Sequence, residues 1–543
     1  NTAVGREALE ENTTGNYNVA VGYRAADSVT TGTYNVAMGR RALDDVTTAS
    51  YNVGIGSSAL ENNTAANNTA VGHSALTANT SGTGGVAVGA LAADAVTTAD
   101  YTTAIGYAAG TALTTADNNT LVGAGAGENL VGANNTALGF RALTSDGGAA
   151  GTYNVALGID ASRYMVNGTE NVAIGRETLE NATAGSYNTA VGAKAADEIT
   201  TGSYNVAIGR SALRAVQTVD SNVAVGASAL ERYTGASNVA VGTSALAFCT
   251  TGTGNTACGH QAGYDLTTAV QNTLVGNFAG TNVTTGNNNV LVGYGAGDAI
   301  TTGTPNTAVG IGAYGAGNGA ENVAIGNSVL GSASSALYNT AIGSTAGYDL
   351  TTGNYNVFVG RYAGTTITTG TFNICVGASS KASAVDGSSQ IVMGYNVTGS
   401  GDSTFTFGSS GTDTTCSMGG TTWTAPSDVR LKEDIQSEEI GLEFINELRP
   451  VTYQWKKAKD VPSEMKVHDP DSEERVMNGK HNHGFIAQEV KEVIDRYDFK
   501  EGFDMWSEDD EDGRQRIGET ALIPILVKAI QELSAEVEKL KGE

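Results

Sequence analysis

The sequence is poor in the residues that usually hold a compact globular domain together. Among 543 residues it has 6 Pro, 4 Cys and 3 Trp, and only 16% of the residues are charged. The cysteines lack both the density of a disulfide scaffold and the CxxC spacing of a metal site; they are Cys249, Cys258, Cys375 and Cys416. We therefore expect no metal and no cofactor. Cys258 and Cys375, which replace small apolar residues of a repeat, are interpreted as packing residues.

Basic residues are also scarce. Lysine and arginine number 30 against 56 aspartate and glutamate residues, so the formal net charge is -26. Nucleic acid and anionic membrane surfaces bind basic patches, so neither partner is expected. No run of about 18 apolar residues occurs, so no membrane insertion is expected either. The chain begins at Asn1, inside a repeat and without an initiator Met or a leader, which indicates a fragment of a longer product.

Glycine, by contrast, is abundant, and much of it is periodic. The opening motif NTAVG recurs as NVAVG, NVAMG, NTLVG and NVFVG in 24 copies, whose closing glycines run from Gly5 to Gly394. Asn stands four residues before this motif glycine in 21 copies. Most copies are 17 residues apart. The other steps are 16 or 19 residues long and end at Gly72, Gly139, Gly158, Gly242 and Gly326.

A single repeat cannot form a core, but stacked repeats can. The short alternating apolar segment, the small-residue segment and the Thr-Thr-Gly turn predict one coil of a parallel β-solenoid or β-roll. The recurrent Asn is predicted to form a ladder whose amides bond the coils above and below. At about 4.8 Å per coil, 24 coils give a rod of roughly 110 Å. Because the apolar side chains are mostly Ala and Val, we expect a thin core and trimerisation about the rod axis.

Composition divides the chain into three predicted parts. Residues 1–394 are the repetitive shaft, and residues 395–426 are a polar neck or linker. Residues 427–543 contain 17 of the 30 Lys and Arg residues and are predicted to form a small mixed α/β domain. Within it the pattern predicts a helix that ends at Pro450, a strand in VTYQWK, and a strand that turns into a helix in HGFIAQEVKEVID.

The last predicted element is a helix with a coiled-coil seam. Its apolar residues are alternately three and four positions apart over nearly three heptads, which predicts self-association. Taken alone, Ile or Val at one position and Leu at the other favours two strands rather than three. The seam residues are Ile523, Leu526, Ile530, Leu533, Val537 and Leu540.

The stretch SDVRLKEDI, residues 427–435, holds a candidate nucleophile and a candidate base. A Ser hydroxyl attacks only when a base takes its proton, and a partly buried Lys can be that base. On a regular helix Ser427 and Lys432 would point about 140° apart, so they meet only in a turn or an extended hook. The alternative is that Ser427 or Asp428 caps a helix and that Lys432 is solvated.

Four motifs in this order resemble the intramolecular chaperone domain of endosialidases and phage tail fibres: SDVRLKEDI, INELRPVTYQWK, HGFIAQEV and LIPILVKAIQEL. The resemblance implies a domain that trimerises, brings the β-rich shaft into register and then cuts itself off. It implies Ser427 as the nucleophile at the Pro426–Ser427 bond, Lys432 as the base and His483 as a further catalytic residue, with His481 as the rival. Enzyme activity would be at most one turnover of self-cleavage, and Pro426, which restricts the attacked carbonyl, leaves cleavage in this chain open.

The repeats resemble a second family. NTAVGxxAL units are similar to the head repeats of trimeric autotransporter adhesins, although those units are usually shorter than 17 residues. This resemblance implies a trimeric left-handed parallel β-roll and, with it, adhesion.

Together these features predict a mainly β, homotrimeric fibre. The leading function is a structural, receptor-binding fibre of a bacteriophage virion. It would contact a host cell-surface glycan or protein, and other virion proteins through a missing N-terminal part. The alternative is a bacterial or prophage-encoded trimeric adhesin on the cell surface. A glycan-cleaving spike is disfavoured because it needs paired carboxylates beside aromatic residues, and the repeats contain no Trp and only scattered acids.

Overall fold

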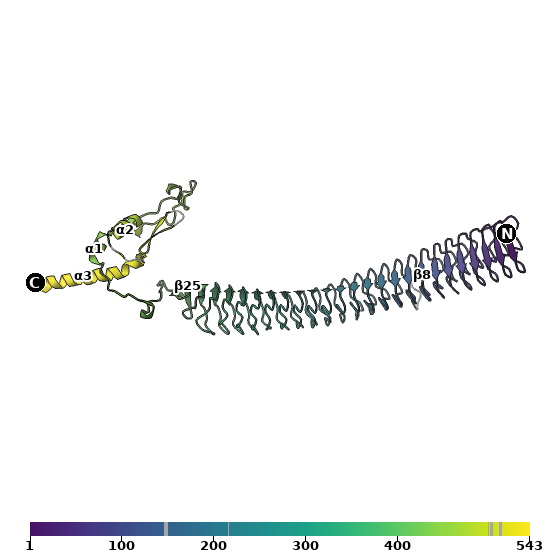
Figure 1. The fold of residues 1–543 in the computed structure, drawn as a ribbon, viewed down its shortest axis with the longest axis horizontal. Coiled ribbons are helices and arrows are strands. Elements are labelled where there is room, and N and C mark those ends of the chain that lie inside the picture. Colours follow the sequence, from purple (N-terminus) through teal and green to yellow (C-terminus); the bar gives the residue numbers. More distant parts are fainter. Residues whose placement is uncertain (146–149, 216, 498, 500–502, 510–512, 543) are drawn as a thin grey trace. The chain divides into compact units, whose positions relative to one another are not determined.

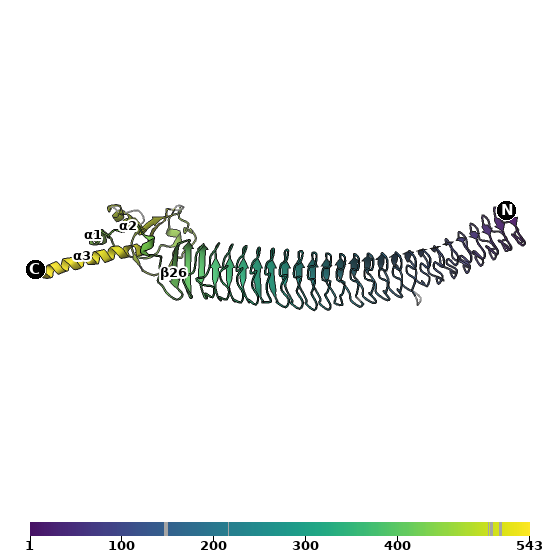
Figure 2. The same ribbon diagram turned by 60° about the horizontal axis from the view of Figure 1, so that its bottom comes forward.

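The chain consists of two compact units, Asn1–Pro426 and Ser427–Glu543. The computed structural model describes residues 1–145, 150–215, 217–497, 499, 503–509 and 513–542. The first unit is a solenoid in which the strands follow one another in a single row, with turns on the other side of each coil (Figures 1 and 2). The second unit combines short strands with three α-helices among its described residues.

The solenoid contributes one parallel strand per coil, which confirms the predicted fold. Neighbouring strands pair with a shift of one repeat, so that Thr2 lies opposite Val19 and Ala3 opposite Ala20. The strands are β1 (Thr2–Val4), β2 (Val19–Val21), β3 (Val36–Met38), β4 (Val53–Ile55), β5 (Thr69–Val71), β6 (Val86–Val88), β7 (Thr103–Ile105), β8 (Thr120–Val122), β9 (Thr136–Leu138), β10 (Val155–Leu157), β11 (Val172–Ile174), β12 (Thr189–Val191), β13 (Val206–Ile208), β14 (Val223–Val225), β15 (Val239–Val241), β16 (Thr256–Cys258), β17 (Thr273–Val275), β18 (Val290–Val292), β19 (Asn306–Val309), β20 (Asn322–Ile325), β21 (Thr340–Ile342), β22 (Val357–Val359), β23 (Ile374–Val376) and β24 (Ile391–Tyr395).

The core of each coil is thin and built from small side chains. In one coil Ala37, Ala42, Leu43 and Val46 are fully buried. The coils approach so closely that the motif glycine has no room for a side chain: a Cβ on Gly22 would lie 2.5 Å from the carbonyl oxygen of the next motif glycine. Its φ of +139° also lies in the region that favours glycine. Contact between coils therefore fixes glycine at the end of every strand.

The predicted asparagine ladder is present and bridges consecutive coils. The side-chain oxygen of Asn35 accepts a hydrogen bond from the backbone N–H of Asn52 at 3.0 Å, and its amide nitrogen donates to the carbonyl of Ala49 at 2.9 Å. The same pattern recurs in distant coils, for example between Asn339 and Asn356 at 2.9 Å. These asparagines are buried, so the ladder satisfies backbone groups that water does not reach.

The two cysteines interpreted as packing residues differ in the structure. Cys375 lies in the middle of its strand and is buried, whereas Cys258 is exposed. Side chains of a strand alternate between the two faces, and Cys258 occupies the last strand position, which points away from the core. Within a single chain Cys258 therefore does not pack in the coil core as Cys375 does, because it falls on the outward side of the pleat.

The segment predicted as a neck contains a β-hairpin. Strand β25 (Thr404–Ser409) pairs parallel with β24, and β26 (Thr412–Ser417) then pairs antiparallel with β25. Trp423 packs edge-on against Phe405 and Phe407, with ring centroids 5.4 and 5.3 Å apart. The hairpin therefore reverses the strand direction and ends the parallel stack.

The second unit has a small core around Phe444, which contacts Tyr497 and Phe499 edge-on. The helix before Pro450, the strand after it, the strand that leads into a helix and the final helix are all present as predicted. Its elements are α1 (Leu442–Glu447), β27 (Val451–Tyr453), β28 (Asn482–Gly484), α2 (Ala487–Ile494), β29 (Trp506–Glu508), β30 (Gln515–Ile517), α3 (Leu522–Gly542) and the short 3-10 turns Val429–Leu431, Ala458–Asp460 and Glu519–Ala521.

Asn205→Ala is expected to loosen the solenoid locally. The substitution removes the partners of the Val219 carbonyl, at 2.8 Å, and of the Asn222 N–H, at 3.0 Å. Each buried group left unpaired costs about 1–3 kcal/mol. Because repeat arrays open locally, amide hydrogen exchange should accelerate in the coils around residue 205, as measured by mass spectrometry. Thr201→Ala, on an exposed turn of the same coil, should leave exchange unchanged; equal profiles for both variants would contradict the role of the ladder.

Candidate functional site

The first six residues of the second unit form a tight hook. The Asp428 carboxylate caps the 3-10 turn Val429–Leu431 by accepting the Arg430 N–H at 2.9 Å. The Arg430 guanidinium also bonds both Asp428 oxygens, with its Nε 3.0 and 3.1 Å away. After one turn the backbone extends again at Lys432, with φ -120° and ψ 139°. The local sequence therefore makes a turn rather than a helix.

This hook brings the candidate nucleophile and base together. Lys432 Nζ donates a hydrogen bond to Ser427 Oγ at 2.7 Å. A regular helix would have separated these side chains, so the single turn is what makes the contact possible. The cap belongs to Asp428, and it coexists with the Ser427–Lys432 contact instead of excluding it. The Arg430 hydrogen bonds also hold the pKa of Asp428 below its ordinary value, so this carboxylate remains an acceptor.

The surroundings of the pair limit what it can do in a single chain. Ser427 and Lys432 are both exposed, as is the whole stretch from residue 421 to residue 439. An ammonium group donates to a hydroxyl but cannot accept its proton, and burial is what lowers the pKa of a lysine enough to make it a base. The geometry of a serine–lysine pair is therefore present, while the burial that would activate it must come from something that covers the hook.

The histidines lie elsewhere in the second unit. His483 is in β28 opposite Thr452 of β27, and its side chain is exposed. It makes no hydrogen bond to Ser427 or Lys432, all three of which the structure describes. His481 has its Nδ1 3.4 Å from Gln454 Nε2. In the described ranges of the chain, no group of three or more His, Cys, Asp or Glu residues forms a metal-type cluster.

His483 borders a groove that no sequence motif predicts. The groove has a volume of about 680 Å³ and is walled by α1, β27, β28 and α3. Its lining is mainly apolar, with Glu519 as the acidic residue, and it includes Leu448, Phe485, Leu522 and Leu526. Neither Ser427 nor Lys432 lines it. The lining residues come from segments as much as 81 positions apart, from Ile445 to Leu526, so no local motif marks the groove.

The predicted seam of α3 faces away from the core of its own unit. Leu522, Ile525 and Ala529 are buried inside the unit. The seam residues remain exposed by 38% to 73%; they are Ile523, Leu526, Ile530, Leu533, Val537 and Leu540. An exposed apolar stripe of this kind marks an interaction surface. No helix in the part of the chain that the structure describes is long and apolar enough to span a bilayer.

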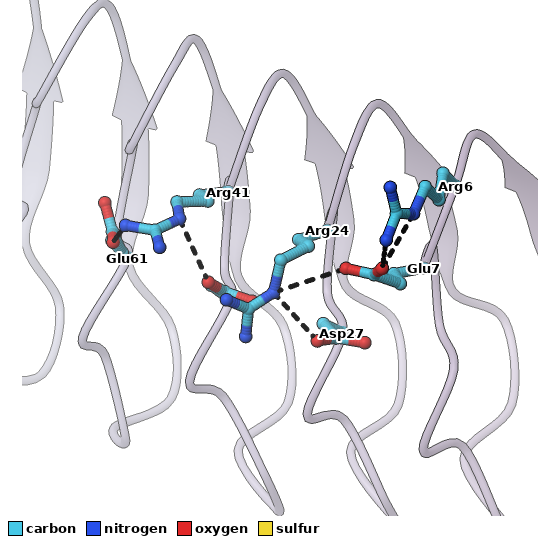
Figure 3. Close-up of polar contacts among 7 residues, drawn as sticks. Arg6, Glu7, Arg24, Asp27, Arg41 and Glu61 are labelled. Carbon is cyan, nitrogen blue, oxygen red and sulfur yellow. Dashed lines mark hydrogen bonds and ion pairs between the residues drawn. The ribbon is translucent and has the colours of Figure 1, made fainter.

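Charged residues on the solenoid form ladders of ion pairs that cross from coil to coil. Arg24 lies 3.0 Å from Asp27 in its own coil and 3.9 Å from Glu7 in the preceding one, and Arg41 lies 2.9 Å from Glu61 (Figure 3). A second ladder farther along includes Arg141 with Asp160, Lys194 with Glu177, and Arg214 with Asp197. The ladders tie neighbouring coils together on the side where the turns lie.

Asp44 is part of the first ladder, 3.4 Å from Arg24 and 3.8 Å from Arg41, and Asp44→Asn is expected to stabilise the solenoid at neutral pH. Burial raises the pKa of Asp44 to about 6, and the nearby Arg24 guanidinium only partly opposes this. A carboxyl whose pKa is higher in the folded than in the unfolded state loses stability as pH rises between these two values. The variant should therefore gain about 1–2 kcal/mol at pH 7.5 and little at pH 4. Thermal unfolding at both pH values checks this; an equal effect at both would contradict it.

Comparison with known families finds a match for the second unit. Residues 427–501 match the family described as chaperone of endosialidase. The match begins at Ser427 and includes Lys432 and His483. No curated protein shows a significant match to the chain, and no solved structure does.

Proposed function

We propose that this chain, whose C-terminal unit contains an endosialidase-type chaperone domain, is the shaft of a homotrimeric fibre made together with its own assembly factor. The observation that carries the proposal is that this domain begins at Ser427, directly after the unit that contains the parallel solenoid. A long β-structure must be assembled in the correct register. The solenoid of repeats is such a structure, and the chaperone would direct its assembly.

The repeats explain why the shaft needs such a factor. Its 24 motif copies are nearly identical, so chains displaced by one coil would make almost the same contacts. Degenerate strands are prone to alternate pairing, and long-range β assembly is slow and exposed to aggregation. A nucleus outside the repeats removes this ambiguity. The exposed seam of α3, from Ile523 to Leu540, supports association of the second units as that nucleus.

The chaperone role predicts that the shaft depends on the second unit during folding but not afterwards. The full chain carrying Ser427→Ala, in which cleavage is prevented, should sediment as a homotrimer. A chain of residues 1–426 expressed alone should yield aggregates or mixed species. Leu533→Glu, on the exposed seam of α3, should reduce trimer yield, whereas Glu536→Gln, a polar substitution on the same helix, should not. A homogeneous trimer from residues 1–426 alone would contradict the role.

The hook at Ser427 supports self-cleavage as the last step. Ser427 Oγ would add to the Pro426 carbonyl carbon while a neutral Lys432 Nζ accepts the hydroxyl proton. The Pro426–Ser427 C–N bond then breaks, the Ser427 nitrogen gains a proton, and Pro426 remains as an ester on Ser427 Oγ. Water hydrolyses this ester, which restores the serine and frees the Pro426 carboxylate. Covering the hook on assembly would supply the burial that the lysine needs.

Cleavage should therefore depend on both members of the pair. Denaturing gels of the assembled full chain are expected to show fragments 1–426 and 427–543, with Ser427 as the new N-terminus on sequencing. Ser427→Ala and Lys432→Met should leave the chain intact, and Ser437→Ala, a serine in the same exposed segment, should cleave normally. His483→Ala tests the further residue that the family resemblance implies. An intact wild-type trimer would remove cleavage from the proposal and leave the chaperone role standing.

For biological setting, we place the fibre on a bacteriophage virion, where it contacts a host cell-surface glycan or protein. A removable chaperone at one end of a repetitive β-shaft supports a virion appendage. Other virion proteins are further proposed partners of this fibre. The alternative is a trimeric adhesin on a bacterial surface, which the likeness of the repeats to adhesin head units favours.

A further inference from the structure

The outward face of the solenoid sheet has a uniform chemistry along the whole row of strands. Three residues before the motif glycine, every copy has Val, Thr or Ile. One residue before it, every copy has Val, Ile, Leu or Met, except for Cys258. No charged residue occurs at either position in any of the 24 copies, although the chain as a whole carries a net charge of -26.

These side chains point out of the coil. The residue between them, such as Ala37 or Ala207, is buried in the core. The flanking residues stay partly exposed even though the coils above and below cover their sides: Met38 is 42% exposed, Leu138 44% and Ile208 39%. Parallel sheets are normally covered on both faces. Here the core of each coil covers one face, and the described residues of the chain leave the other to solvent.

The charges lie on other parts of each coil. The ion-pair ladders use residues two and five positions after the motif glycine, as with Arg24 and Asp27 after Gly22. Exposed tyrosines stack at the corner before the strand, where Tyr17, Tyr34 and Tyr51 have ring centroids 4.8 and 5.1 Å apart. Polar and aromatic side chains thus occupy the turns and corners, whereas the strand face carries only uncharged side chains, mostly aliphatic ones with Thr among them.

We infer that this outward sheet face is the surface through which the shafts of the proposed trimer pack on one another. Its occupant is a second copy of this chain. A side chain repeated every 4.8 Å or so along the row matches a partner only if the partner has the same pitch, as another copy has. The uncharged face also lets copies with a large negative charge meet without like charges opposed. This inference rests on the trimer proposed above.

The size of the face is sufficient for a stable interface. Strands of three residues give a width of about 10 Å, and the row of coils gives a length of roughly 110 Å. In a trimer each face of roughly 1,100 Å² is shared between two neighbours, so each pair of chains would bury roughly 1,100 Å² in total, which clears the approximately 1,000 Å² expected of a biological interface. Packing there would bury the uncharged sheet face and leave the ion ladders and the tyrosine corners for contacts with other molecules.

A natural reporter lies on this face. Cys258 is the exposed cysteine, whereas Cys249, Cys375 and Cys416 are buried. In copies that share one register, the Cys258 residues lie at the same height, and a slip of one coil separates them by about 4.8 Å along the row. We expect a short bismaleimide to link chains of the full-length Ser427→Ala protein through Cys258. Cys258→Ala should abolish the link, and Thr201→Cys in that background, on an exposed turn, should not restore it.

Substitutions test the face independently of the thiol. Ile208→Glu should accelerate amide exchange in the coils around residue 208 in the full-length trimer, and Thr201→Glu, in an exposed turn of the same coil, should leave it unchanged. Sedimentation distinguishes a failure of the proposed trimer from a failure of the proposed packing face. A monomeric full chain overturns the trimer and this face together. A trimer without Cys258 cross-links, in which Ile208→Glu and Thr201→Glu behave alike, overturns the face alone and retains the trimer.

Discussion

The structure of the shaft depends on the buried asparagine that each coil contributes beside its strand. Its side chain bonds two backbone groups of the next coil, so the coils can stack closely although their interior is thin. Close stacking in turn demands glycine at the end of the strand, and alanine is the commonest residue in the middle, although Leu or Phe also occurs there, as at Leu121 and Phe358.

Periodicity made most of the shaft predictable. One coil per repeat and the asparagine ladder follow from the spacing of Asn and Gly, because a 17-residue repeat fixes which residues stack. It was harder to predict which strand residues point into the core. Cys258 shows this, because a shift of one position along the strand decides whether a side chain is buried. How the 16-residue coils are filled was not predictable either. Tyr233 and Tyr314 are buried in two of them, and the Tyr314 hydroxyl bonds the ladder residue Asn322 at 3.0 Å.

In the second unit the local motifs located the elements, but not the tertiary features. The contact between Ser427 and Lys432 depends on a single capped turn, whose capping residue, Asp428, was one of two that the sequence offered. The groove beside His483 brings together α1, β27, β28 and α3, and no spacing in the sequence relates these segments. Such a groove follows from packing, which is why only the structure shows it.

The hairpin of β25 and β26 has a consequence for the shaft if the proposed cleavage removes the second unit. A stack of parallel strands ends in an open row of N–H and C=O groups, which is a template for unwanted growth. Here the last strand runs in the opposite direction, and its outer side is itself partly paired: Thr415 and Thr424 exchange two backbone hydrogen bonds of 2.8 Å. All of these residues precede Pro426. A shaft released at that bond would keep this antiparallel, partly paired end strand and would not add further strands there.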